Sequence, residues 1–181
     1  MSKPLKGIDV CQIPKCDCSG RVNFQDPNLK FTANICPNCS LQGSSVSTEF
    51  SGATFNSTIV NLPQCLSTDG GTILNVTGFG TIIDGPLIVQ GTFMFQLLES
   101  LVGDNRLYFT ASGMDGNGVT ISISAFPILV DEDLMINFCN SCNSSFLGMT
   151  KKTSKSHKLR EEISKGTLMI IKNGQIEVKE L

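Results

Sequence analysis

The sequence predicts a mainly β protein, an antiparallel β-sandwich or jelly roll with a cysteine-bearing N-terminal arm and a C-terminal β-hairpin. Apolar and β-branched residues alternate with Ser, Thr and Asn over short runs, which is typical of half-buried strands. Turn signals rich in Gly, Asp and Asn separate these runs at short intervals, as in sandwiches and jelly rolls. The chain has 181 residues, no Trp, one Tyr and eleven Phe. It is long enough for one ordinary domain, with a core built from Phe, Ile, Leu and Val.

The central strands are delimited by their turns. We expect early strands at 28–35, 46–50 and 53–61, then two short β-branched runs broken by glycine within 72–85, and further strands at 87–98, 106–112 and 119–126. The last of these alternates apolar and hydroxyl residues from Val119 to Phe126, the pattern of a strand with one buried face. Gly91 lies inside a long apolar run and predicts a bulge or bend. Only Phe93–Leu101 could be helical instead.

The C-terminus predicts a separate hairpin. Asn173-Gly174 lies between two alternating runs within 167–181, and this dipeptide favours a type I′ turn. An isolated hairpin is marginal in water, so it should pack on the domain or pair with a neighbouring subunit. Before it, residues 147–166 form a polar, basic linker or short helix. The predicted organisation is therefore an arm at 1–40, a sandwich at 41–146, this linker, and the hairpin.

The charges are distributed unevenly along the chain. Between Leu41 and Thr150 the only basic residue is Arg106, among nine acidic ones. A freely diffusing protein usually mixes both signs on its surface. Two interpretations stay open: copies of the same chain cover much of this surface, or hydroxyl and amide side chains alone keep it soluble.

Eight cysteines are arranged in a way that chance would rarely produce. Three close pairs, Cys16/Cys18, Cys36/Cys39 and Cys139/Cys142, are accompanied by Cys11 and Cys65. Most lie outside the predicted sandwich or at its edges. We take all eight as candidate disulfide or cross-linking residues, within or between subunits.

A structural zinc site is the alternative interpretation of the same residues. The Cys36-Pro-Asn-Cys39 turn has the spacing of a zinc knuckle, and Cys16 and Cys18 could complete a Cys₄ tetrahedron with it. Redox catalysis by a Cys-x-x-Cys motif would need a βαβ context, which neither flank offers. We therefore expect no cofactor, apart from this possible zinc.

Several classes of function have no support in the sequence. His157 is the only histidine, in the polar linker, and no phosphate-binding loop or nucleophile elbow occurs. We therefore expect no enzymatic activity. A net charge of −2 and the lack of a long apolar run predict no nucleic-acid or membrane partner. The N-terminus has no Sec-type apolar region, so we expect synthesis in the cytoplasm.

In architecture the chain resembles bacterial endospore surface and appendage subunits. The features that carry the resemblance are Cys11, Cys16 and Cys18, the Ser/Thr/Gly-rich strands, and the late Cys139 and Cys142. The resemblance implies a self-assembling β-sandwich that becomes cross-linked by disulfides on a cell, spore or particle surface. It assigns no residue a role beyond cross-linking. The Cys-Cys doublet common in appendage subunits is absent.

The leading hypothesis is therefore a structural protein that forms a homo-oligomer or polymer, as a subunit of a fibre, coat or shell. The alternative is a zinc-stabilised β-sandwich binding module, such as a phage or viral accessory protein. A carbohydrate-binding sandwich is a third hypothesis, and the lack of Trp and the single Tyr count against it.

Overall fold

A computed structural model describes residues 16–139, 166–172 and 174–180. It contains twelve strands and two short 3₁₀ turns. In chain order they are β1 (Cys18–Gln25), β2 (Leu29–Ile35), η1 (Pro37–Cys39), β3 (Ser45–Phe50), β4 (Ala53–Val60), β5 (Gln64–Thr68), β6 (Gly71–Asp84), β7 (Leu87–Ser100), β8 (Asn105–Met114), β9 (Thr120–Leu129), η2 (Asp131–Asp133), β10 (Leu134–Phe138), β11 (Gly166–Lys172) and β12 (Gln175–Glu180). The prediction of a mainly β, antiparallel fold is confirmed.

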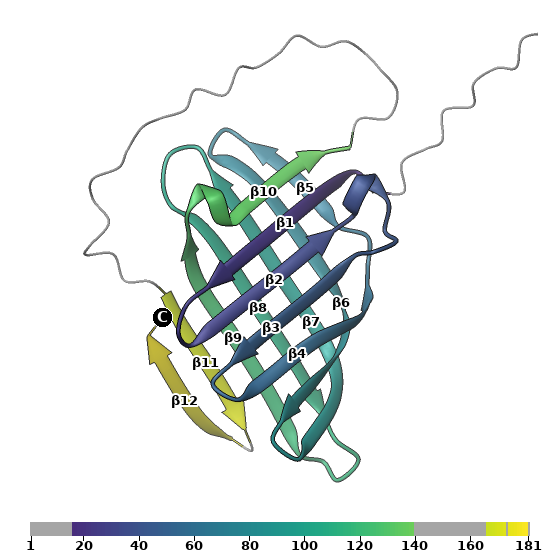
Figure 1. Cartoon of the computed structure of the whole chain (residues 1–181), viewed down its shortest axis with the longest axis vertical. Helices are drawn as coiled ribbons and strands as arrows, with labels where there is room; N and C mark the ends of the chain where they lie inside the picture. Colours follow the sequence, from purple (N-terminus) through teal and green to yellow (C-terminus); the bar gives the residue numbers. More distant parts are fainter. Residues whose placement is uncertain (1–15, 140–165, 173, 181) are drawn as a thin grey trace, which may run out of the picture.

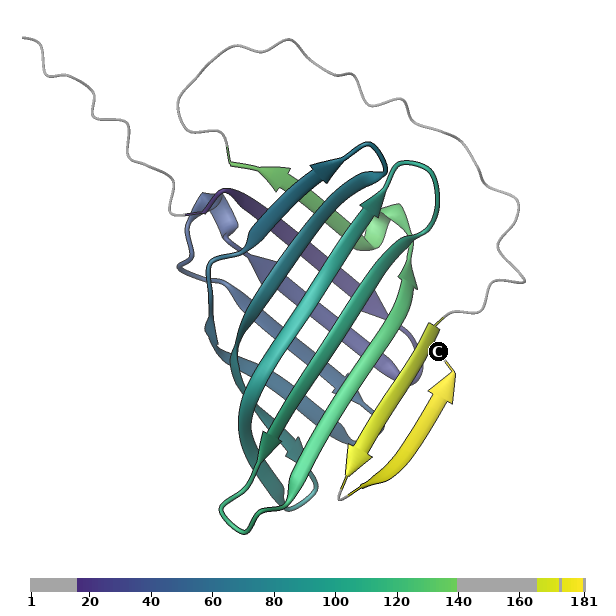
Figure 2. The same cartoon turned by 180° about the vertical axis from the view of Figure 1, so that it is seen from behind.

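All the described strands belong to one hydrogen-bonded sheet. Its order is β10-β1-β2-β3-β4-β6-β7-β8-β9-β11-β12, and β5 pairs with β6 beside this path. Neighbours along the chain are mostly neighbours in the sheet, as in a meander. The sandwich or jelly roll is therefore not confirmed. The single sheet curls over the core as a half-barrel, with β1 to β4 facing β6 to β9 (Figures 1 and 2).

The connection between β9 and β10 shows why the sheet must curl. β10 pairs with β1 at one edge, whereas β9 lies near the other end of the strand order. Only residues 130–133 separate the two strands along the chain. The end of β9 must therefore come close to β1, which brings the two halves of the sheet together around the core.

Phenylalanine rings join the two halves. Phe31 of β2 contacts Phe95 of β7 and Phe109 of β8, with ring centroids 5.8 and 5.3 Å apart. Phe55 of β4 contacts Phe93 and Phe109 at 5.3 and 5.4 Å. All five rings are buried, and their tilted and edge-to-face contacts add to the hydrophobic gain from burial.

A row of glycines allows backbones and rings to approach closely in this region. Gly80, Gly91 and Gly113 lie opposite one another on β6, β7 and β8. A Cβ atom at Gly80 would collide with the ring of Phe55, and one at Gly91 with the carbonyl oxygen of Ser112. Such glycines let a sheet bend. The β6–β7 register passes Gly91 without a shift, so the bulge that the sequence suggested there is not found. The register shift lies instead in β4.

The predicted hairpin is β11 and β12, and it packs within the same chain. β11 pairs with β9 from Gly166↔Pro127 to Lys172↔Ile121. Leu168 is buried, and Lys172 forms an ion pair with Asp84 at 2.6 Å. At the other end of the chain, β1 and β2 lie in the sheet although they fall within the range assigned to the arm. Most of the linker and its possible helix lie outside the described residues.

Candidate functional site

The six described cysteines gather at one end of the half-barrel, where η1, β5 and the end of β10 meet the start of β1 (Figure 1). Cys16 pairs with Cys36, Cys18 with Cys65, and Cys39 with Cys139. The Cα–Cα distances are 6.2, 6.3 and 5.6 Å, within the range of protein disulfides. This supports the predicted disulfides. Cys11 and Cys142 lie outside the described residues.

The turn after β2 directs two neighbouring cysteines to different partners. Cys36, Asn38 and Cys39 all have positive φ angles of 48°, 53° and 59°. Cys39 donates its backbone N–H to the carbonyl of Cys36 at 2.9 Å, and Cys36 donates its own to Ser44 Oγ at 2.8 Å. This tight turn points one sulfur toward Cys16 and the other toward Cys139.

Each disulfide joins segments that are distant in sequence, with separations of 20, 47 and 100 residues. The Cys18–Cys65 bond joins β1 to β5, which belongs with the β6 half of the sheet. The Cys39–Cys139 bond ties η1 to the residue that follows β10. Of the three bonds, Cys18–Cys65 joins the two halves of the sheet at this end, while the other two lie within the half that holds β10, β1 and β2.

The structure does not bring Cys16, Cys18, Cys36 and Cys39 together as a zinc site, because each has a cysteine partner in a disulfide. A disulfide sulfur is not the thiolate that zinc binds. Among the residues that the structure describes, no group of three or more His, Cys, Asp or Glu side chains could hold a metal ion. No helix in the same ranges is long and apolar enough to cross a bilayer.

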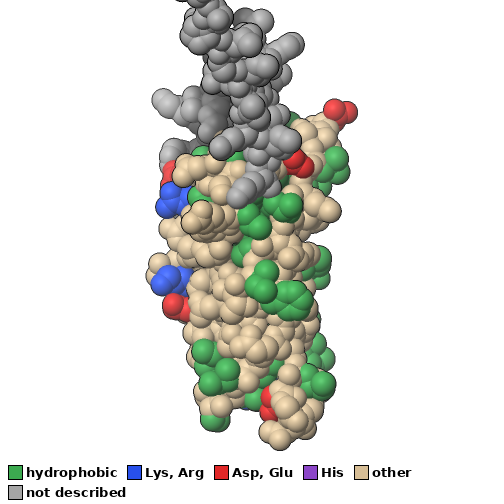
Figure 3. Space-filling model, turned by 90° about the vertical axis from the view of Figure 1, so that its right-hand side faces the viewer, with side chains coloured by type: hydrophobic (Ala, Val, Ile, Leu, Met, Phe, Trp, Pro, Cys, Tyr) green, Lys and Arg blue, Asp and Glu red, His purple; other side chains and the backbone are tan. Residues whose placement is uncertain are grey.

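A second feature is the outer face of β6 to β9. We define it as the odd-numbered residues of β6 from Ile73 to Ile83, and the even-numbered residues of β7 from 88 to 98, β8 from 106 to 114 and β9 from 120 to 128. Arg106 is the only charged residue among them. The opposite half differs, because the outward residues of β1 to β3 include Arg21 and the ion pair Lys30–Glu49. The side of the molecule in Figure 3 shows hydrophobic side chains among uncharged side chains and backbone, with only a few charged groups.

Polar side chains on the outer face bond to one another across strands. Gln90 donates to Thr81 Oγ1 at 2.7 Å, and Gln96 donates to Asn75 Oδ1 at 2.8 Å. Apolar groups lie between them: Phe79 is 50% exposed and Met94 is 42% exposed. Tyr108 stacks edge-on against Phe126 with ring centroids 4.7 Å apart.

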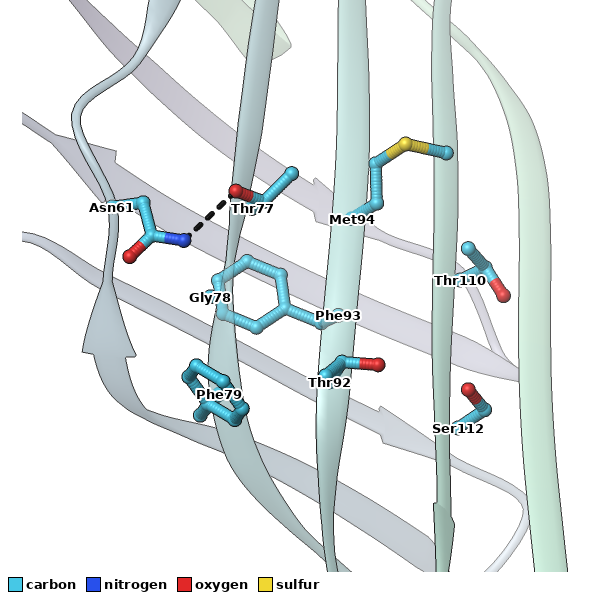
Figure 4. Close-up of a pocket in the computed structure, with 9 residues that line it drawn as sticks. All are labelled: Asn61, Thr77, Gly78, Phe79, Thr92, Phe93, Met94, Thr110 and Ser112. Carbon is cyan, nitrogen blue, oxygen red and sulfur yellow. Dashed lines mark hydrogen bonds between the residues drawn. The ribbon is translucent and has the colours of Figure 1, made fainter.

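A depression of about 310 Å³ lies on this face (Figure 4). Its rim and floor combine hydroxyl, amide, aromatic and thioether groups from the loop before β5 and from β6 to β8. Asn61 closes one side by donating to Thr77 Oγ1 at 3.0 Å. No ionisable side chain lines it; the lining residues are Asn61, Thr77, Gly78, Phe79, Thr92, Phe93, Met94, Thr110 and Ser112. The depression can take up an uncharged group, such as an apolar side chain.

No known family model, curated protein or solved structure matches this chain.

Proposed function

We propose that this protein is a self-assembling structural subunit of a fibre, coat or shell, stabilised by disulfides. The observation that carries the proposal is the outer face of β6 to β9, which spans four long neighbouring strands with a single charged residue. Large exposed apolar patches on soluble proteins mark interaction sites, and the cores of protein interfaces are depleted in charge. A second copy of the chain is the partner we propose for this face.

The pairing of polar groups on the outer face supports this proposal. Covering a polar group costs free energy when its hydrogen bond is lost. The amides of Gln90 and Gln96 and the hydroxyl of Ser124 already have partners on adjacent strands. They keep these bonds when water leaves, so another copy could cover the face at a low desolvation cost.

The disulfides fit a subunit that must hold its shape outside the cell. Disulfides persist in oxidising surroundings and are rare in cytosolic proteins. The three described bonds lie within one chain and fasten it internally. The location that we propose is the surface of a cell, spore or particle, reached after synthesis in the cytoplasm.

A negative charge placed on the outer face tests the proposal. Thr92 is exposed, between Phe79 on β6 and Ser112 on β8. Thr92→Glu would bury an unpaired carboxylate in the contact, which costs about 3–5 kcal/mol. We expect at least a hundred-fold weaker association in sedimentation equilibrium of the oxidised full chain.

Thr32→Glu is the matched control, because Thr32 is an exposed threonine on β2 of the opposite half. It should associate like the unmodified chain. A chain that stays monomeric at all concentrations would refute self-assembly. Equal association of both variants would refute the outer face as the contact.

A further inference from the structure

The strand β12 forms an open edge of the sheet. Within the described residues it pairs only with β11, from Lys172↔Gln175 to Thr167↔Glu180. Lys172 and Gln175 flank a two-residue turn, so they form the hydrogen-bonded pair that closes it. Hydrogen-bonded and non-hydrogen-bonded pairs alternate along an antiparallel ladder. The backbone groups that point away from β11 are therefore those of Ile176, Val178 and Glu180.

The side chains on this edge carry charges of both signs and two exposed apolar groups. Glu177 and Lys179 lie on one face of the strand, with Lys179 Nζ 2.9 Å from Glu177 Oε1. Ile176 and Val178 lie on the other face and are 65% and 55% exposed. Their cross-strand neighbours on β11 are Ile171 and Met169. These two residues pair in turn with Ser122 and Ser124 of β9, so they lie on the same side of the sheet as the outer face.

We propose that β12 pairs antiparallel with β12 of a second copy, about a two-fold axis at Val178. This axis places Val178 opposite Val178 of the second copy. The outward-pointing N–H and C=O groups of the two strands then face each other and can form hydrogen bonds. The axis also places Glu177 of each copy opposite Lys179 of the other. The contact has two opposite-charge pairs, each in a non-hydrogen-bonded position where side chains come closest.

The charge pattern rejects the neighbouring two-fold registers. An axis at Glu177 would place this carboxylate opposite its own copy, and an axis at Lys179 would do the same with two ammonium groups. An axis midway between two neighbouring residues would place a residue whose backbone groups point outward opposite one whose groups point back to β11. The hydrogen bonds between the two copies of β12 could then not form. Like charges directly opposite are destabilising, so the sequence Glu-Val-Lys selects Val178 as the centre.

The pairing also extends the proposed assembly surface, and in this respect it rests on the proposed function. Val178 lies on the same side of the sheet as Met169 and, beyond it, Ser124. Joining two copies at Val178 makes their outer faces one continuous surface. A two-fold edge contact and a separate face contact together provide the two interfaces that an extended assembly requires.

Charge reversal tests the pairing in the oxidised full chain. Glu177→Lys and Lys179→Glu, each alone, place like charges opposite in both pairs. We expect each to weaken edge association about ten-fold or more at low salt. Two combinations restore opposite pairs: the double variant E177K/K179E, and an equimolar mixture of the two single variants. Native mass spectrometry with one single variant labelled with ¹⁵N should show mixed pairs in excess of both homotypic pairs.

The matched control reverses the exposed Lys30–Glu49 pair of β2 and β3. K30E and E49K change the net charge as much as the β12 variants but lie on the opposite half. They should neither weaken association alone nor favour mixed pairs. If these control variants also associate more weakly alone and favour mixed pairs, net charge explains the effect of the β12 variants and the edge pairing is wrong. If the chain assembles and the β12 variants change nothing, the edge pairing fails while the proposed function stands.

A backbone variant gives a second readout. Val178→Pro removes an N–H that points away from β11, so the hairpin keeps its ladder. We expect V178P to stay folded by circular dichroism and to lose the edge contact. A folded V178P that associates like the unmodified chain overturns the pairing. A monomeric unmodified chain overturns both this inference and the proposed function.

Discussion

Replacing Cys39 and Cys139 together by alanine is expected to lower the free energy of unfolding by about 4–5 kcal/mol. The bond joins residues separated by 100 positions, and a disulfide that closes a longer loop removes more conformational entropy from the unfolded chain. It also ties η1 to the end of β10, an edge strand of the sheet. Urea unfolding of the oxidised variant, followed by circular dichroism, measures the change.

The other disulfides provide the comparison. Replacing Cys16 and Cys36, separated by 20 residues, should lower the free energy of unfolding by about 3 kcal/mol. The loss on replacing Cys18 and Cys65 should lie between this value and the value for Cys39 and Cys139. A reductant should destabilise the chain more than any one replacement, whereas a chelator should have no effect. Unfolding by the chelator alone would contradict the disulfide account and favour the zinc alternative.

Phe109→Ala is expected to destabilise the fold by about 3–5 kcal/mol. Phe109 is fully buried, and it contacts Phe31 and Phe55 across the core. Removing its ring leaves a cavity between the two halves of the sheet and removes two aromatic contacts. The measurement is denaturant unfolding of the oxidised chain.

Phe79→Ala is the matched control, because Phe79 is on the outer face and 50% exposed. Its effect on unfolding of the single chain should stay within about 0.5 kcal/mol, while its effect on association should be larger. An equal loss of stability for both variants would contradict the assignment of Phe109 to the core and Phe79 to a contact surface.

Much of the sheet could be predicted because its strands alternate and its turns are marked. The hairpin of β11 and β12 follows from Asn173-Gly174, and Gly174 has the positive φ of 78° that such a turn needs. Strand β1 is not among the predicted strands, because a cysteine such as Cys18, which is fully buried, can serve as a cross-linking residue or as a core residue. Strand β5 has no alternation of buried and exposed residues, so no local pattern could reveal it.

The partners of the cysteines could not be predicted from their spacing. Residues close in sequence, such as Cys36 and Cys39, bond to different and distant partners. Eight cysteines allow 105 complete pairings, and the curl of the sheet decides among them by bringing β5 and the end of β10 to the start of β1. This curl arises from long-range strand pairing, which a local sequence pattern does not encode.

The scarcity of charge was visible in the sequence, but its location required the fold. Acidic residues such as Asp69, Asp104 and Asp115 fall in turns between the strands, while the outward residues of β6 to β9 are almost uncharged. Strand periodicity shows that alternate residues share a face. Only the sheet order shows that four such faces adjoin, with their polar groups paired across strands.

Hydroxyl-radical footprinting of the assembled, oxidised chain tests the central claim most directly. We predict that Phe79, Met94 and Tyr108 on the outer face are oxidised several-fold more slowly in the assembly than in the Thr92→Glu variant. Met135 and Phe138 of β10 are similarly exposed, at 46% and 50%, and should react equally in both. Equal oxidation of the outer-face residues in the assembled chain and in the Thr92→Glu variant would contradict the account.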